Sequence, residues 1–339
     1  MLRCNKLEDF NAVIIYTSFR DVCLVIYEIN KNILGTVEEL PFAIREFRNK
    51  IKLFEKGGNQ KVYHQIIQQH LVDYKDYTDN IGFYLNDNGQ AIGSTIYPEY
   101  LLRRLQYLKE PTEEDKPEIF NFAREVGSEL QRIINIFERE IPSLLQPNVN
   151  ESKFIEVQKS RVTYKDVNHS KLFNGDESSN VFKYRLILIL QEAFAIQWIH
   201  EIYNINIINR DTIDEYFLFR FTINRFDSIV DSLINLQKFS TVQFDELNIS
   251  SAGKLNKLLE DYMVNDFEAV AELRNTLHYD DVKNFYDYFV EIDSLDGLNA
   301  LLTINNKIYQ YIDDFLEISS ISSTPLIELI IKSLFSNGL

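Results

Sequence analysis

The sequence predicts a mainly α protein built of helical bundles, and three observations carry this prediction. None of the seven prolines falls between residues 148 and 324, so long helices can run through that part of the chain. Apolar residues recur there at spacings of three and four, as on one face of a helix. Hydrophobic residues make up 45% of the chain, which is the composition of a folded protein with packed cores.

The N-terminal half is expected to be mostly helical. Helix ends are marked by Gly35 and by the Gly57-Gly58 pair, and a helix start is marked by Thr112, Asp115 and Pro117. The helices predicted from these signals and from periodicity cover residues 8–32, 38–54, 60–78, 98–109 and 117–140.

One non-helical segment interrupts this half. Residues 81–97, IGFYLNDNGQAIGSTIY, have β-type residues on both sides of an Asn-Asp-Asn-Gly turn, which predicts a small β-hairpin. Residues 153–167 give a weaker strand signal.

The C-terminal half is expected to form a helical bundle. Its clearest helix covers residues 211–239, because the apolar side chains of Phe217, Phe221, Leu233 and Leu236 recur with helical spacing. Further helices are predicted at residues 179–204, 250–263, 265–279, 298–318 and 325–336.

The polar stretch NGDESSN, residues 174–180, is the best linker in the chain. It predicts a boundary near residue 175. The expected domains are therefore an N-terminal helical domain, residues 1–175, which carries the hairpin, and a C-terminal helical bundle, residues 176–339.

Composition limits the classes of function. The apolar stretches have charged interruptions, which argues against a membrane span, and the N-terminus lacks the features of a signal peptide, so a cytoplasmic location is expected. The net charge of -16 is concentrated in residues 201–339, which carry 10 basic and 23 acidic residues. This balance argues against broad, sequence-independent binding to a phosphate backbone.

The segment AELRNTLHY brings three polar side chains, Arg274, Asn275 and His278, within about one helical turn. On a helix, Arg274 and His278 continue the apolar stripe of Phe267 and Ala271. The two cationic groups are therefore expected to face a packed surface, where an arginine needs a carboxylate, a partner subunit or a bound phosphate.

Two interpretations of this pair stay open. A histidine titrates near neutral pH and an arginine stabilises a developing phosphodiester charge, so His278 and Arg274 could cleave RNA without a metal. Alternatively, both cations stabilise the C-terminal end of a helix beside Asp280 and Asp281.

The motif ELRNTLHY, with the preceding helix FTINRFDSIVDSLINL, resembles the HEPN superfamily over about residues 180–320. The resemblance implies an HEPN-like helical bundle that dimerises and acts as a metal-independent ribonuclease in toxin, CRISPR-associated or anti-phage settings. Arg274 would bind the scissile phosphate, Asn275 would be the polar neighbour and His278 the acid/base, with RNA as substrate and no cofactor or metal.

The motif differs from the usual family pattern in its spacing. Three residues separate Arg274 from His278, where the family usually has four to six. A non-catalytic interaction or regulatory protein with the same fold and a protein partner is therefore the alternative function. The other acidic motif, DDFLE at residues 313–317, has the form of a magnesium-binding sequence, but we expect a solvated helix face there.

Overall fold

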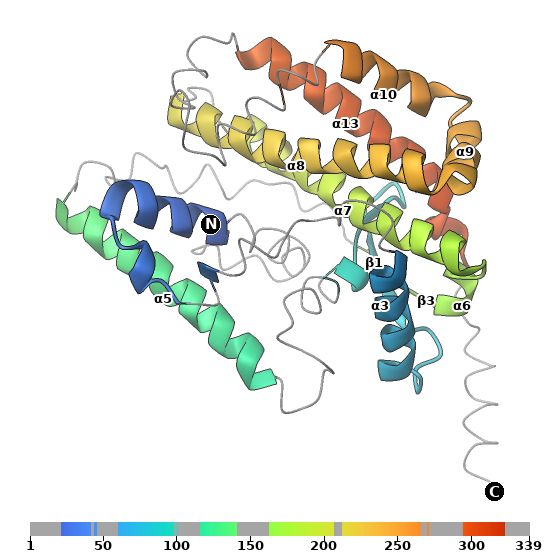
Figure 1. Ribbon diagram of the computed structural model, residues 1–339, viewed down its shortest axis with the longest axis horizontal. Coiled ribbons are helices and arrows are strands. Elements are labelled where there is room, and N and C mark those ends of the chain that lie inside the picture. Colours follow the sequence, from blue (N-terminus) through green and yellow to red (C-terminus); the bar gives the residue numbers. More distant parts are fainter. Residues whose placement is uncertain are drawn as a thin grey trace, which may run out of the picture. The chain divides into compact units, whose positions relative to one another are not determined.

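The computed structural model describes residues 22–41, 44–45, 60–97, 100, 116–140, 163–206, 212–265, 270 and 294–322. These residues are mainly helical, and they include one small antiparallel sheet whose strands precede the C-terminal helices in the sequence (Figure 1). This confirms the predicted fold class. Within these ranges no helix is both long and apolar enough to cross a membrane.

Contacts divide the chain into two compact units. The first unit contains residues 1–54 and 98–158, and the second contains residues 55–97 and 159–339. The second unit thus combines the hairpin with the C-terminal helices. The predicted division at residue 175 cuts the sequence once, into residues 1–175 and 176–339. It stays a prediction.

In the first unit, a helix that includes residues 22–29 continues as a short π-helical turn, Asn30–Leu34 (η1), and stops at Gly35. Gly35 has a φ of 68°, a left-handed conformation that favours glycine, so this helix ends where the sequence predicts. The short 3-10 turn Val37–Glu39 (η2) follows. The long helix α5, Lys116–Glu140, matches the prediction for residues 117–140.

The second unit is built around α7, Glu177–Asn206. Most of its side chains from Val181 to His200 are buried, because α3 (Gln60–Asp73), α8 (Thr212–Phe239), α13 (Ser294–Leu316) and strand β2 (Ala91–Ser94) pack against it. Figure 1 shows α8 and α13 running beside α7. A helix with apolar residues all round, such as RLILIL followed by AFAI, is stable only in such a central position.

The start of α7 is fixed by the predicted linker. The Asp176 carboxylate accepts a hydrogen bond of 2.8 Å from the Ser179 N–H, as an N-cap does, and this bond holds the pKa of Asp176 below its usual range. Asn180 bonds both backbone groups of Gly175 at 3.0 Å. A Cβ on Gly175 would lie 2.8 Å from that of Ser179, so the tight approach requires glycine.

The sheet has the strand order β2-β1-β3 and is antiparallel throughout. Strands β1 (Ile81–Leu85) and β2 (Ala91–Ser94) form the predicted hairpin, and β3 (Thr163–Val167) falls within the weaker strand segment. Inside the turn, Asn86 Oδ1 accepts bonds from the N–H groups of Asn88 and Gln90. One face of β1, with Ile81, Phe83 and Leu85, is buried.

The sequence did not predict helix α9 (Thr241–Ser250) of the second unit. The expected helix at residues 250–263 is α10, Lys254–Asn265, and a separate helix α9, Thr241–Ser250, lies between it and α8. Residues Ala252 and Gly253 have positive φ values of 55° and 76°, which turn the chain between α9 and α10. The turn between α8 and α9 and the turn between α9 and α10 both lack proline, so helical propensity alone did not show that the chain turns there.

Other predicted elements have outcomes of their own. Helix α13 confirms the prediction for residues 298–318, and the short elements α6 (His169–Leu172) and η5 (Ile318–Ser320) were not expected. Most residues of the predicted helices 38–54, 98–109 and 265–279, and all residues of the predicted helix 325–336, lie outside the described ranges.

Candidate functional site

The three residues predicted to act on RNA, Arg274, Asn275 and His278, lie outside the described residues. The described residue nearest to them along the sequence is Val270, which is helical and 5% exposed. Val270 borders the predicted stripe, whose own residues, Phe267, Ala271, Arg274 and His278, lie outside the described ranges.

The described part of the second unit holds a different polar site, inside the bundle. Arg225 of α8 donates a hydrogen bond to the Glu192 carboxylate of α7, and both side chains are 0% exposed. The Tyr97 hydroxyl, just after β2, donates to the other carboxylate oxygen of Glu192. Glu192 therefore joins two helices and the hairpin through one buried carboxylate.

Three further polar contacts join α7 to its neighbours. The Gln191 side-chain oxygen accepts a bond of 3.2 Å from the Ser94 N–H of β2. Asn305 of α13, 0% exposed, donates to the Ala193 carbonyl at 2.9 Å. His200 lies 2.7 Å from the Thr222 hydroxyl of α8, and both residues are buried.

This arrangement determines what the cluster can do. An ion pair away from water is stable only when its geometry and its hydrogen bonds are nearly complete. The Arg225 guanidinium also stacks over the Phe221 ring, with 4.3 Å between its central carbon and the ring centroid. Because Glu192 and Arg225 are enclosed in the described structure, the cluster orients α7, α8 and the hairpin and presents no reacting group to solvent.

The sequence contained a signal for this cluster. Gln191 and Glu192 interrupt an otherwise apolar helix, and they served only to argue against a membrane span. Arg225 likewise follows a strongly apolar part of α8. Charged residues within helices that must be buried predict paired side chains, but the sequence does not identify the partner.

A second junction joins α13 to the hairpin. The Asp313 carboxylate accepts a 3.1 Å bond from the Ala91 N–H, and the Tyr309 hydroxyl donates a 2.9 Å bond to the Ala91 carbonyl. One turn of α13 thus satisfies both backbone groups of Ala91, the first residue of the edge strand β2. Burial raises the pKa of Asp313 and of Tyr309. Asp313 was expected on a solvated helix face, and this part of the DDFLE prediction is wrong.

Cationic side chains hold the segment that follows α13. Lys165 of β3 donates to the Ser319 carbonyl, and Lys171 of α6 donates to the Ser322 carbonyl at 2.7 Å. Next to them the His169 Nδ1 lies 3.2 Å from the Asn80 amide nitrogen. Burial lowers the pKa of Lys165 and of His169. These contacts are structural, since each group bonds to the chain's own backbone or amides.

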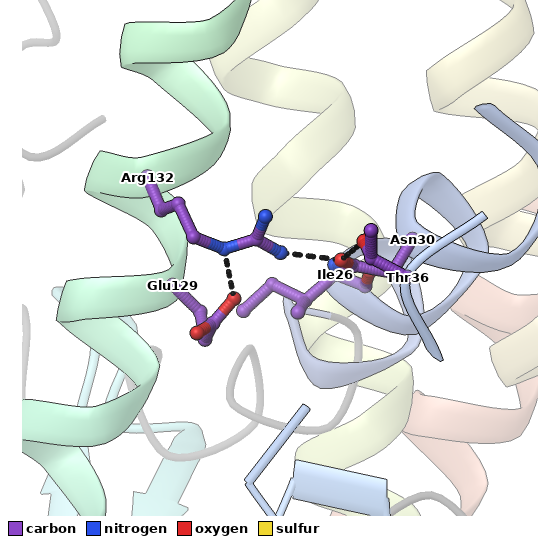
Figure 2. Close-up of polar contacts among 5 residues, drawn as sticks. All are labelled: Ile26, Asn30, Thr36, Glu129 and Arg132. Atoms are coloured by element: carbon purple, nitrogen blue, oxygen red, sulfur yellow. Dashed lines mark hydrogen bonds and ion pairs between the residues drawn. The ribbon is translucent and has the colours of Figure 1, made fainter. Parts of the chain in front are cut away.

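The first unit has its own polar cluster, shown in Figure 2. Asn30, 0% exposed, donates to the Ile26 carbonyl at 2.8 Å and accepts from the Thr36 hydroxyl at 2.6 Å. Arg132 of α5 donates to the Asn30 side-chain oxygen, and its Nε donates to Glu129 at 2.9 Å. This cluster fastens the end of the first helix to α5.

Comparisons with known proteins leave the family of this chain open. No protein-family model, no curated protein and no solved structure matches it. Among the described residues there is also no group of three or more His, Cys, Asp or Glu placed to hold a metal ion. The functional argument therefore rests on the chain's own residues.

Proposed function

We propose that this chain is an HEPN-like, metal-independent endoribonuclease whose reactive residues are Arg274, Asn275 and His278. The observation that carries the proposal is the sequence ELRNTLHY, with arginine and histidine four positions apart. The helical character of the second unit and the buried, helical Val270 support it. As such an enzyme, the protein would act as a cytoplasmic homodimer in prokaryotic defence or stress response.

The chemistry needs only these side chains and RNA. Neutral His278 takes the proton of a ribose 2′-hydroxyl, and the resulting oxygen attacks the adjacent phosphorus. The bond from phosphorus to the 5′-oxygen breaks, that oxygen takes a proton from water, and the hydroxide left behind takes the proton from His278, which returns to its neutral form. The products are a 2′,3′-cyclic phosphate and a 5′-hydroxyl. Arg274 holds the phosphate oxygens while their negative charge grows.

The test is incubation of purified protein with mixed cellular RNA, with and without EDTA, followed by a denaturing gel and analysis of RNA ends. We expect EDTA-resistant cleavage with cyclic phosphate ends, lost in Arg274→Ala and in His278→Ala. His64→Ala is the matched control, because it removes a part-exposed histidine of α3 that is not in the motif. The His64 Nε2 lies 3.8 Å from a carboxylate oxygen of Glu177. Cleavage that survives in His278→Ala would contradict the proposal.

One observation favours a second function, a non-catalytic interaction or regulatory module of the same fold. Only Asn275, Thr276 and Leu277 separate Arg274 from His278, which is shorter than the spacing usual in the HEPN superfamily. Intact RNA in every lane of the same gel, with folded protein, would favour this module over the nuclease.

A further inference from the structure

Helix α9 is apolar on two opposite faces. Its inner face presents Phe244 and Leu247, which are 1% and 0% exposed. Its outer face presents Val242 and Ile249, which are 65% and 75% exposed. A helix that only covers a bundle has a polar outer face, so packing against the described helices of the second unit does not explain the outer apolar residues of α9.

The exposed residues form a regular row. With 3.6 residues per turn, Val242, Asp245, Glu246 and Ile249 fall on one side of α9, at i, i+3, i+4 and i+7. All four are exposed. We call them the α9 stripe: an apolar residue at each end and two carboxylates in the middle. Figure 1 shows α9 at one end of the α8, α10 and α13 group.

The charge of the stripe selects its occupant. The part of the chain that contains α9, residues 201–339, has 10 basic against 23 acidic residues, and such a negative net charge attracts cations. Burial lowers the pKa of Lys183 on α7, and the negative charge of Glu246 opposes that decrease. Nucleic acid, with its negative phosphates, is disfavoured at such a surface.

The same charges disfavour a second copy of this chain. In a two-fold pairing of α9 with α9, the ends of the stripe meet as Val242 against Ile249, but the central carboxylates of both copies face each other. Like charges at an interface cost affinity and select against that partner.

We propose that the α9 stripe is a docking surface for a cationic amphipathic helix of a partner protein. Apolar side chains of the partner, one helical turn or two apart, contact Val242 and Ile249, and its lysines or arginines pair with Asp245 and Glu246. Helix α9 has 10 residues, about 15 Å in length, so the contact is small and the complex reversible. The proposal does not depend on the nuclease function.

The test uses the full-length protein and a fluorescein-labelled 18-residue helical peptide that has leucines on one face and lysines beside them. Fluorescence anisotropy gives its affinity. We expect binding to wild type, about tenfold weaker binding to the double variant Val242→Ser/Ile249→Ser, and a similar loss for Asp245→Asn/Glu246→Gln. A peptide with glutamates in place of the lysines should not bind.

Two controls separate docking at the stripe from general attraction to an acidic protein. Val72→Ser changes a valine of α3 that is 60% exposed, so it should leave the affinity unchanged. Circular dichroism confirms that each variant is folded. Equal affinity of wild type and the Val242→Ser/Ile249→Ser protein, or no binding of the lysine peptide at all, would overturn the proposal.

Size-exclusion chromatography with light scattering tests the other occupant. We expect the same molar mass for wild type and for Val242→Ser/Ile249→Ser. If wild type is a dimer and the double variant is a monomer, the stripe pairs two copies of the chain and the proposal of a cationic partner is wrong.

Discussion

Each unit of the molecule contains an arginine–glutamate pair, and the two pairs differ in their surroundings. Arg225 and Glu192 in the second unit are both 0% exposed. Arg132 and Glu129 in the first unit are neighbours on α5, with side chains 33% and 14% exposed. Removing the glutamate should therefore cost much stability in the buried pair and little in the part-exposed pair. Water can solvate the arginine left behind in the first unit, but it does not reach Arg225.

The largest effect is expected for Glu192→Ala. It leaves the buried Arg225 guanidinium and the Tyr97 hydroxyl without their carboxylate, so the free energy of unfolding should fall by about 3–5 kcal/mol. Urea unfolding followed by Trp198 fluorescence measures this, because the single tryptophan of the chain lies in α7.

The matched control replaces the whole pair by apolar residues of similar volume, as Glu192→Leu/Arg225→Met. This variant should recover most of the stability lost in Glu192→Ala, because no uncompensated charge stays inside. A loss of less than about 1 kcal/mol in Glu192→Ala would show that water reaches the pair.

The comparison also shows what the sequence could predict. Periodicity and glycine positions predicted α5, α7, α8, α13 and the hairpin, because these depend on local pattern. The pairing of Glu192 with Arg225 was not predictable, since they lie 33 positions apart and many registers of α7 against α8 would have been consistent with the pattern. Helix α9 was missed because apolar residues on both of its faces hide the helical period.

The intermediate case is Asp313, whose carboxylate is only partly buried beside the hairpin. Asp313→Ala removes the acceptor of the Ala91 N–H and should lower the free energy of unfolding by about 1 kcal/mol. Trp198 fluorescence during urea unfolding again gives the value, and Gln310→Ala, on the exposed side of α13, should change it less.

The pH dependence of this site has a defined sign. Burial raises the pKa of Asp313 in the folded state above its ordinary value of 3.8, so folding favours the protonated form. The stabilisation linked to this proton is complete below pH 3.8 and is lost as the pH rises through the folded-state pKa. Wild type should therefore lose stability relative to Asp313→Asn between about pH 4 and neutrality. A pH-independent difference between the two proteins would contradict this.

The smallest effect is expected for Glu129→Ala in the first unit. Glu129 receives one bond from Arg132, but Arg132 also bonds to Asn30, and its part-exposed guanidinium keeps contact with water (Figure 2). The free energy of unfolding should fall by only about 0.5 kcal/mol. Hydrogen exchange of the amides of α5 measures this, because the first unit lacks a tryptophan. Asn30→Ala should deprotect the same amides far more, since it removes the buried group on which Arg132, Thr36 and Ile26 converge. If Glu129→Ala were as damaging as Glu192→Ala, exposure to water would not be the reason that the two pairs differ.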